Sequence, residues 1–162
     1  MVIVVIGVAG SGKSTIGARL AECLGWVFCE GDSFHPTANV EKMARGTPLT
    51  EADRTPWLAA LRARIAAALA ANENIVVACS ALKESHRQRL RVDLEKVRLV
   101  YLKGDPQIIS QRLRARQGHF MKETMLASQL AALEEAPDAL VLDIDAAPDV
   151  IVQRIRAGIP IG

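Results

Sequence analysis

The sequence has few cysteines and little net charge. Its 162 residues include three cysteines, and 20 basic residues nearly balance 18 acidic ones. An odd number of cysteines without C-x-x-C spacing argues against a disulfide framework and a zinc site. Cys23, Cys29 and Cys79 are therefore predicted to be buried, reduced thiols of a cytoplasmic protein. A formal net charge of +2 does not indicate nucleic acid as a partner.

Long hydrophobic runs are also missing. No apolar run approaches the roughly 20 residues that cross a bilayer, so no membrane partner is expected. The N-terminal apolar run has no basic residue before it and is interrupted at Gly7 and Gly10, unlike a signal peptide. Half of the residues are nonetheless hydrophobic, which suffices for the core of a single domain over residues 1–162.

A glycine-rich stretch lies between an apolar run, residues 2–6, and a segment with helical periodicity, residues 16–24. Gly7, Gly12, Lys13 and Ser14 match the phosphate-loop (P-loop) pattern G-x-x-x-x-G-K-[ST] in its strand–turn–helix context. Glycines let successive N–H groups point at a polyphosphate, which the positive end of the helix also attracts. Lys13 would reach the β- and γ-phosphates, and the Ser14 hydroxyl would bind Mg²⁺. The residues predicted to bind ATP here are Gly7, Ala9, Gly10, Ser11, Gly12, Lys13, Ser14 and Thr15.

Four further apolar runs, at residues 26–29, 75–79, 97–102 and 140–145, are predicted strands. Helices are predicted over 84–94, 106–116, 125–135 and 149–157, and another begins with Thr55 as N-cap and Pro56 as first residue. Residues 33–57 form a polar excursion that is too long for an ordinary connection and is expected to be functional. The alternation predicts an α/β, three-layer P-loop NTPase around a five-stranded parallel sheet. By resemblance to nucleoside monophosphate and shikimate kinases, the predicted strand order is 2-3-1-4-5.

GTPases, motor ATPases and small-molecule kinases share this motif, and three features favour a kinase. The chain is short, and its third apolar run ends in Cys79-Ser80 rather than in the acidic residue of a Walker B strand. A basic, glycine-containing loop near residue 118 looks like a lid, predicted over residues 116–124, that would exclude water from the transfer. Arg112 and Arg116, four residues apart, are predicted catalytic residues that meet the triphosphate.

Several blocks of residues lie between the predicted strands. They include Gly31-Asp32-x-x-His35-Pro36, Asn39, Lys42-Met43, Gly46-x-Pro48-Leu49, Asp53-Arg54-x-Pro56-Trp57-Leu58, Cys79-Ser80-Ala81-Leu82-Lys83, Gly118-His119-Phe120, Ser128-Gln129 and Leu133-Glu134. From about Gly7 to Glu135 the sequence resembles the gluconokinases, with one departure at His86, where many relatives carry tyrosine.

This resemblance implies an activity, cofactors and an assembly. Gluconokinases use ATP and Mg²⁺ to phosphorylate D-gluconate at its 6-hydroxyl, giving 6-phospho-D-gluconate and ADP for the pentose phosphate and Entner–Doudoroff routes. They are generally homodimers. A related sugar-acid or shikimate-type kinase remains an alternative, as does a nucleotide-binding regulatory module without turnover.

The ligand contacts expected of such an enzyme fall near the carboxyl ends of the strands. Asp32 is predicted to orient or deprotonate the 6-hydroxyl and could hold Mg²⁺ through water; alternatively it closes an Asx turn. Because guanidinium groups match a carboxylate and short polar groups match hydroxyls, the further substrate candidates are His35, Lys42, Arg54, Lys83, Arg87, Arg91 and His119. For Lys42, Lys83, Arg87 and Arg91 the alternative is a solvated helix face or surface ion pairs. Residues 145–148 are expected to border the adenine.

Overall fold

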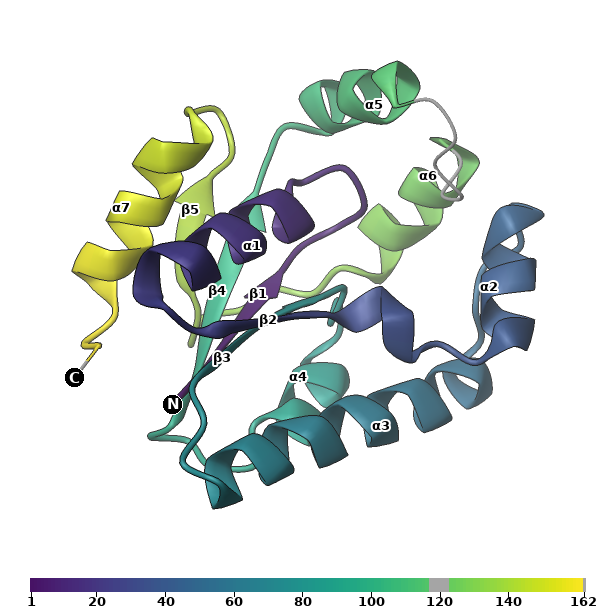
Figure 1. Ribbon diagram of the computed structural model, residues 1–162. Coiled ribbons are helices and arrows are strands. Elements are labelled where there is room, and N and C mark those ends of the chain that lie inside the picture. Colours follow the sequence, from purple (N-terminus) through teal and green to yellow (C-terminus); the bar gives the residue numbers. More distant parts are fainter. Residues whose placement is uncertain (117–122, 162) are drawn as a thin grey trace.

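Five strands form one parallel sheet in the computed structural model, which describes residues 1–116 and 123–161 (Figure 1). The strands are β1 (Val2–Ile6), β2 (Val27–Glu30), β3 (Ile75–Cys79), β4 (Val97–Lys103) and β5 (Leu140–Asp143). Their order, β2-β3-β1-β4-β5, confirms the predicted order, and every pairing is parallel.

Helices cover both faces of the sheet. Helices α1 (Lys13–Leu24) and α7 (Pro148–Gly158) lie on one face, and α3 (Glu51–Ala70) and α4 (Glu84–Leu90) lie on the other (Figure 1). Ile3 and Val5 of β1 belong to the apolar cluster of the first face, and Val2, Val4 and Ile6 to that of the second. Burial on both faces explains why the central strands are uniformly apolar, since successive side chains point to opposite sides.

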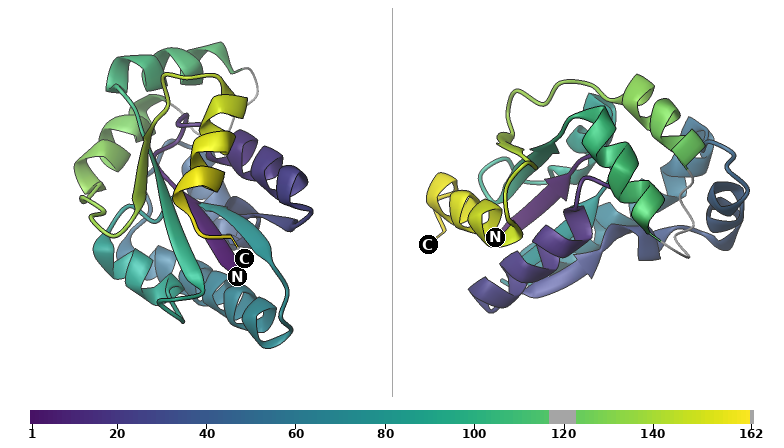
Figure 2. Two further views of the ribbon diagram at one scale, coloured as in Figure 1. Left: turned by 90° about the vertical axis from the view of Figure 1, so that its left-hand side faces the viewer. Right: turned by 90° about the horizontal axis from the view of Figure 1, so that it is seen from above.

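The remaining elements gather where β1 runs into the glycine-rich turn. They are the short 3₁₀ helix η1 (Gly31–Phe34), α2 (Thr37–Ala44), α5 (Pro106–Ala115) and α6 (Glu123–Ala132). Both chain ends lie at the opposite end of the molecule, where β1 begins (Figure 2). The carboxyl ends of the strands and the helices around them therefore form the region in which a ligand of an open parallel sheet is expected.

The prediction that Thr55 caps a helix was wrong. Helix α3 begins at Glu51, with Thr50 as N-cap: Thr50 Oγ1 accepts from the Asp53 amide at 3.1 Å, and the Asp53 carboxylate accepts from the Thr50 amide at 2.8 Å. This reciprocal capping box begins the helix one turn earlier, and Pro56 lies inside it. Thr-Pro was a genuine start signal, but the stronger Thr-x-x-Asp signal precedes it.

The cysteine prediction holds in part. Cys79 is buried, which raises the pKa of its thiol, and Cys29 is half-buried, but Cys23 is exposed. Helix α1 turns Ile16, Leu20 and Ala21 toward the sheet, and Cys23 lies off that face. None of the helices within residues 1–116 and 123–161 is long and apolar enough to cross a membrane.

Candidate active site

The glycine-rich turn, residues 7–12, joins β1 to α1 in a conformation that its glycines permit. Gly10 has a φ of 79° and Gly12, the N-cap of α1, has a φ of 95°. A Cβ at Gly10 would lie 2.9 Å from the Leu113 side chain of α5, so this position requires glycine for space as well as for its dihedral angle. The turn thus presents backbone N–H groups at the start of a helix, the geometry that binds phosphates.

Lys13 begins α1 and lies beside residues that follow β2 and β3 at the carboxyl edge of the sheet. Its Nζ donates to the carbonyl oxygen of Val8 at 3.0 Å. Burial lowers the pKa of the Lys13 ammonium, and the charge of Asp32 opposes that effect. One cavity is lined by Lys13 and Ser14, by Asp32 and Ser80, and by Arg116. The structure therefore brings together Lys13, Asp32 and Arg116, although Lys13 and Arg116 are 103 positions apart in the sequence.

A second cavity, of about 200 Å³, lies beside the first and shares Gly10, Gly12 and Arg116 with it. Thr15 and Arg112 also line it, together with Ala146 and Pro148 from the segment after β5. Nη2 of Arg112 donates to the carbonyl oxygen of Ile144 at 3.1 Å. A cavity with apolar side chains on one part of its wall, next to a phosphate-binding turn, suits a nucleoside, and it contains part of the loop expected near adenine.

The backbone that carries Asp32 is fixed by β3 and α3. A Cβ at Gly31 would collide with the carbonyl oxygen of Ala78, so only glycine lets η1 approach β3 this closely. The carbonyl oxygen of Gly31 accepts a hydrogen bond from Trp57 Nε1 at 2.9 Å. Trp57 is buried, and its hydrogen bond also sets the position of the residue before Asp32.

His35 is held by two neighbours. Its ring stacks on that of Trp57, with centroids 4.3 Å apart and an interplanar angle of 13°. Asn39 Nδ2 lies 3.2 Å from His35 Nδ1 and donates to the carbonyl oxygen of Asp53 at 2.8 Å. Because an amide nitrogen only donates, Nδ1 accepts and Nε2 carries the ring proton. Burial and, secondarily, the charge of Arg54 lower the pKa of His35 to about 4, so the ring is a neutral N–H donor at neutral pH.

The cationic candidates on α2, on α3 and at the start of α4 differ in their partners. Arg54 is half-buried, and burial lowers its pKa; no hydrogen bond or ion pair to another residue of the described ranges engages its guanidinium. Lys42 pairs with Asp53 at 2.7 Å and Lys83 pairs with Glu51 at 3.0 Å. The two lysines form the ion pairs that were the alternative to substrate contact, and Arg54 remains available to a ligand.

His86 joins the ion pair of Lys83. Its Nε2 lies 3.0 Å from a Glu51 carboxylate oxygen, and its Nδ1 accepts from the Lys83 amide at 3.5 Å. The hydrogen bond from His86, with a smaller contribution from Lys83, lowers the pKa of Glu51 to about 2. Burial lowers the pKa of His86, which fits a neutral ring that donates through Nε2. This cluster connects the start of α3 to the start of α4.

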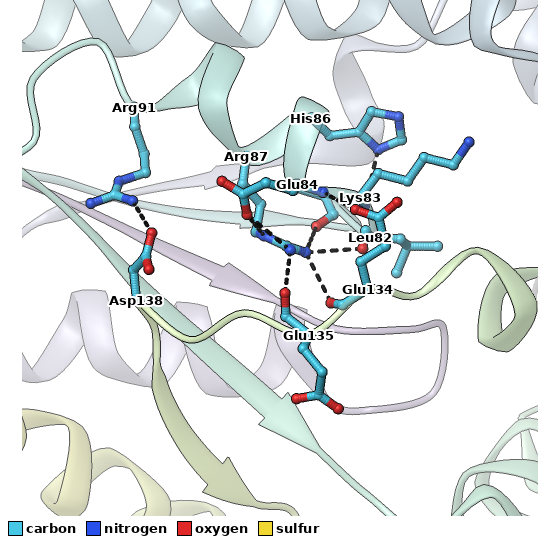
Figure 3. A network of polar contacts seen from close by, with 10 residues as sticks. Leu82, Lys83, Glu84, His86, Arg87, Arg91, Glu134, Glu135 and Asp138 are labelled. Atoms are coloured by element: carbon cyan, nitrogen blue, oxygen red, sulfur yellow. Dashed lines mark hydrogen bonds and ion pairs between the residues drawn. The ribbon is translucent and has the colours of Figure 1, made fainter.

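Arg87 and Arg91 do not reach the candidate site, contrary to their prediction as substrate residues. The Arg87 side chain is 1% exposed, and its guanidinium donates to the carbonyl oxygens of Ala81, Leu82, Glu134 and Glu135 and pairs with Glu84 (Figure 3). Arg91 pairs with Asp138 at 2.6 Å, just before β5 begins. Through these hydrogen bonds Arg87 connects residues 134–135, after α6, to residues 81–82, after β3.

Two buried amides contribute contacts for which the sequence predicted no role. Asn39 orients His35, and Gln129 Oε1 accepts from the Ala9 amide at 2.7 Å. The N–H of Ala9, a predicted ATP ligand, is thus bound to the protein, although Ala9 lines the first cavity. In the sequence, such a role is indicated only by a polar residue on an otherwise buried face of a helix, as Asn39 is beside Met43 on α2. His119 and most of the predicted lid lie outside the described residues.

Comparisons with known proteins identify the family of the chain. Residues 2–137 match the family described as an AAA domain. A gluconokinase of Gluconobacter oxydans is 43% identical over 94% of this chain and 88% of its own. The crystal structure of a gluconokinase from Sinorhizobium meliloti 1021 is 42% identical, with a TM-score of 0.85 over 96% of this chain and 89% of that one. A sugar kinase from a Janibacter species is 40% identical, with a TM-score of 0.90 over 96% and 92%. The chain belongs to the gluconokinases, a family of P-loop kinases.

Proposed function

We propose that this protein is a gluconokinase that transfers the γ-phosphoryl group of ATP to the 6-hydroxyl of D-gluconate, giving 6-phospho-D-gluconate and ADP. The observation that carries this proposal, beside family membership, is the shared cavity of Lys13, Asp32 and Arg116. A carboxylate opposite a phosphate-binding turn and two cations is the arrangement that phosphoryl transfer to an alcohol requires.

The cations act on the phosphates in this proposal. Backbone N–H groups of Gly10 and residues 12–15 hold the triphosphate, since the Ser11 amide donates to Val8 O, and Lys13 reaches the β- and γ-oxygens. Arg116, which lines both cavities, stabilises the charge that develops on the transferred group, and Arg112, which lines the second cavity, meets the triphosphate from the nucleoside side. The 6-hydroxyl of gluconate attacks the γ-phosphorus, ADP leaves, and Asp32 orients the hydroxyl and accepts its proton.

Mg²⁺ fits the residues that are present. The exposed Ser14 hydroxyl lies one residue after Lys13, and Asp32 lines the same cavity. Within residues 1–116 and 123–161 no three His, Cys, Asp or Glu side chains converge as a metal site. A single hydroxyl with a nearby carboxylate suits Mg²⁺, because this ion keeps several water ligands and binds together with the phosphates of the nucleotide. The ion would neutralise charge on the β- and γ-phosphates.

Arg54 and His35 are the proposed gluconate ligands. Arg54 supplies a guanidinium without a protein partner among the described residues, which matches the gluconate carboxylate. His35 supplies an Nε2–H donor for a hydroxyl. Lys42 and Lys83, already paired with Asp53 and Glu51, hold the start of α3, which carries Arg54. We further propose a cytoplasmic homodimer that serves the pentose phosphate and Entner–Doudoroff routes, testable by light scattering of the purified protein.

A kinetic screen with ATP and D-gluconate, other sugar acids and shikimate tests the substrate assignment. Gluconate should give the highest kcat/KM; turnover of another acid without gluconate would identify a different kinase, and no turnover would favour a regulatory module. Asp32→Asn should lower kcat by about 10²–10⁴-fold with ATP affinity retained, because it removes the proton acceptor. Asp149→Asn, on the exposed start of α7, is the matched control. A near-normal rate for Asp32→Asn would remove its catalytic assignment.

A further inference from the structure

The peptide unit between Val8 and Ala9 is held on both of its sides. On the carbonyl side, Val8 O accepts from Lys13 Nζ at 3.0 Å and from the Ser11 amide at 3.2 Å. On the amide side, Ala9 N–H donates to Gln129 Oε1 at 2.7 Å, the shortest of these contacts. Because the carbonyl and the N–H belong to one rigid plane, the glutamine amide fixes the direction of the carbonyl that holds the lysine.

Gln129 lies on α6, 120 residues from its partner, and is well placed to hold it. Its side chain is 6% exposed, and Ala9 is 6% exposed. The buried N–H of Ala9 lies in a turn and has no strand or helix partner. Leaving it unpaired is unfavourable, so Gln129 Oε1 provides the acceptor that this N–H requires. Loss of this acceptor would free the peptide plane to rotate.

The chain beyond α6 is itself anchored, which makes α6 a fixed support. The Glu134 amide donates to Leu82 O at 2.9 Å, and the Glu134 carboxylate accepts from the Glu84 amide at 2.7 Å. Arg87 donates to the carbonyl oxygens of Glu134 and Glu135, as Figure 3 shows. On the other side of the turn, Ile109 and Leu113 of α5 approach Gly10. Residues 8–10 are therefore held between α5 and α6.

We infer that Gln129 is a positioning residue for Lys13, acting through the Val8–Ala9 peptide to place the ammonium group for the phosphates. Lys13 has three ammonium protons, and one is directed at Val8 O. Fixing that oxygen limits where the other two can point. The inference rests on the proposed function for its catalytic consequence, but its effect on ATP binding requires no acceptor substrate.

Gln129→Met tests the inference, because methionine keeps the length of the side chain and lacks the carbonyl acceptor. It should lower kcat for gluconate phosphorylation about 10-fold or more, since misplacing a catalytic group by about 1 Å costs up to about 10²-fold. The KM for gluconate should stay within about twofold of the wild-type value. Gln129→Asn, which keeps the amide on a shorter stem, should behave alike. Gln111→Met, on the exposed surface of α5, applies the same change where it should have no effect.

A double-mutant cycle with Lys13→Met separates positioning from general stabilisation. If Gln129 acts through Lys13, Gln129→Met should change the residual rate of Lys13→Met by less than about twofold. Circular dichroism confirms folding, and all rates are measured well below the melting temperature of each variant. Equal losses in the wild-type and Lys13→Met backgrounds would overturn the inference, as would a destabilised Gln129→Met enzyme with an unchanged kcat.

ATP binding without acceptor distinguishes this inference from the proposed function. Binding of a fluorescent ATP analogue should weaken about fivefold or more in Gln129→Met, and not further in the Lys13→Met background. If the wild-type protein fails to phosphorylate gluconate, the proposed function fails, yet this binding cycle still tests Gln129. Unchanged ATP affinity in Gln129→Met, together with unchanged kcat, would leave Gln129 with no role in placing Lys13.

Discussion

The two halves of the candidate active site are built by different means. The phosphate-binding part of the proposed nucleotide half is one contiguous stretch, residues 7–15, in which the proposed phosphate contacts are mainly backbone N–H groups set by glycine dihedral angles. The acceptor half draws on η1, α2 and α3, and its side chains are oriented by other side chains. Asn39 orients His35, and Trp57 holds the carbonyl oxygen of Gly31. A substitution in one half should therefore leave the other half intact unless it lies where they meet.

Because of this difference, substitutions in the two halves should affect function in different ways. Within residues 7–15 of the nucleotide half, replacing a side chain should affect function only if that side chain itself reaches the phosphates, as we propose for Lys13; Gln129 acts on this half from α6, through the Val8–Ala9 peptide. In the acceptor half, a residue that touches no ligand can still alter substrate binding, because it fixes the tautomer or position of one that does. The two kinds of substitution should be distinguishable in steady-state kinetics, as changes in kcat or in the KM of one substrate.

Lys13→Met should have the largest effect. Removing a preorganised cation from the transferring group should lower kcat by about 10³-fold, because the charge developing in the transition state loses its stabilising partner. The KM for gluconate should change little. Lys96→Met, an exposed lysine before β4, is the control for loss of positive charge. A comparable rise in the KM for gluconate would contradict the separation of the two halves.

Asn39→Leu should affect the acceptor half alone. The substitution removes the donor to His35 Nδ1 and to the carbonyl oxygen of Asp53. We expect the KM for gluconate to rise about 10-fold, the consequence of roughly 1.4 kcal/mol of lost positioning. The KM for ATP should be unchanged. Glu41→Gln on the exposed face of α2 is the control, and an equal rise in both KM values would show that the halves are coupled through α2.

The nucleotide half and the sheet were predictable from sequence because each depends on local pattern. The P-loop motif specifies a backbone, and uniformly apolar runs specify buried parallel strands. The start of α3 was mispredicted because two capping signals compete five residues apart. Thr50 with Asp53 makes a reciprocal pair of hydrogen bonds, whereas Thr55 offers a cap without a partner three residues on.

The acceptor half was only partly predictable because its contacts are distant in sequence. Helical spacing placed Arg87 and Arg91 on one face of a helix, but it does not identify the carbonyl groups that pack against that face. Trp57 contacts Gly31 across 26 positions, and Arg87 contacts residues up to 48 positions away. Only the packed structure brings such groups together, so a buried arginine and a ligand-binding arginine look alike in sequence.

The pH dependence of stability tests the neutral state assigned to His35. Its pKa is lowered from about 6.5 to about 4 in the folded protein. Between these values the unfolded chain binds a proton that the folded protein does not, so the free energy of unfolding should fall as pH is lowered from 6.5 to 4. His35→Gln should make that decline shallower in urea unfolding between pH 7 and 5. His86, whose pKa is also lowered, contributes the same sign and should leave a residual slope. An unchanged slope would contradict a neutral, buried His35.

The smallest effect distinguishes the two candidate starts of α3. Thr50→Ala removes the side-chain acceptor for the Asp53 amide and should lower the free energy of unfolding by about 1 kcal/mol. Thr55→Ala should change it by no more than about 0.5 kcal/mol, because Thr55 is exposed and its hydroxyl only donates to the Glu51 carbonyl oxygen within the helix. Urea unfolding of the two variants at one pH makes the comparison. The reverse ranking would return the helix start to Thr55. The expected ranking would show that the N-terminal turn bearing Asp53 and Arg54 is capped at Thr50, which places Arg54 on regular helix and not in the preceding loop.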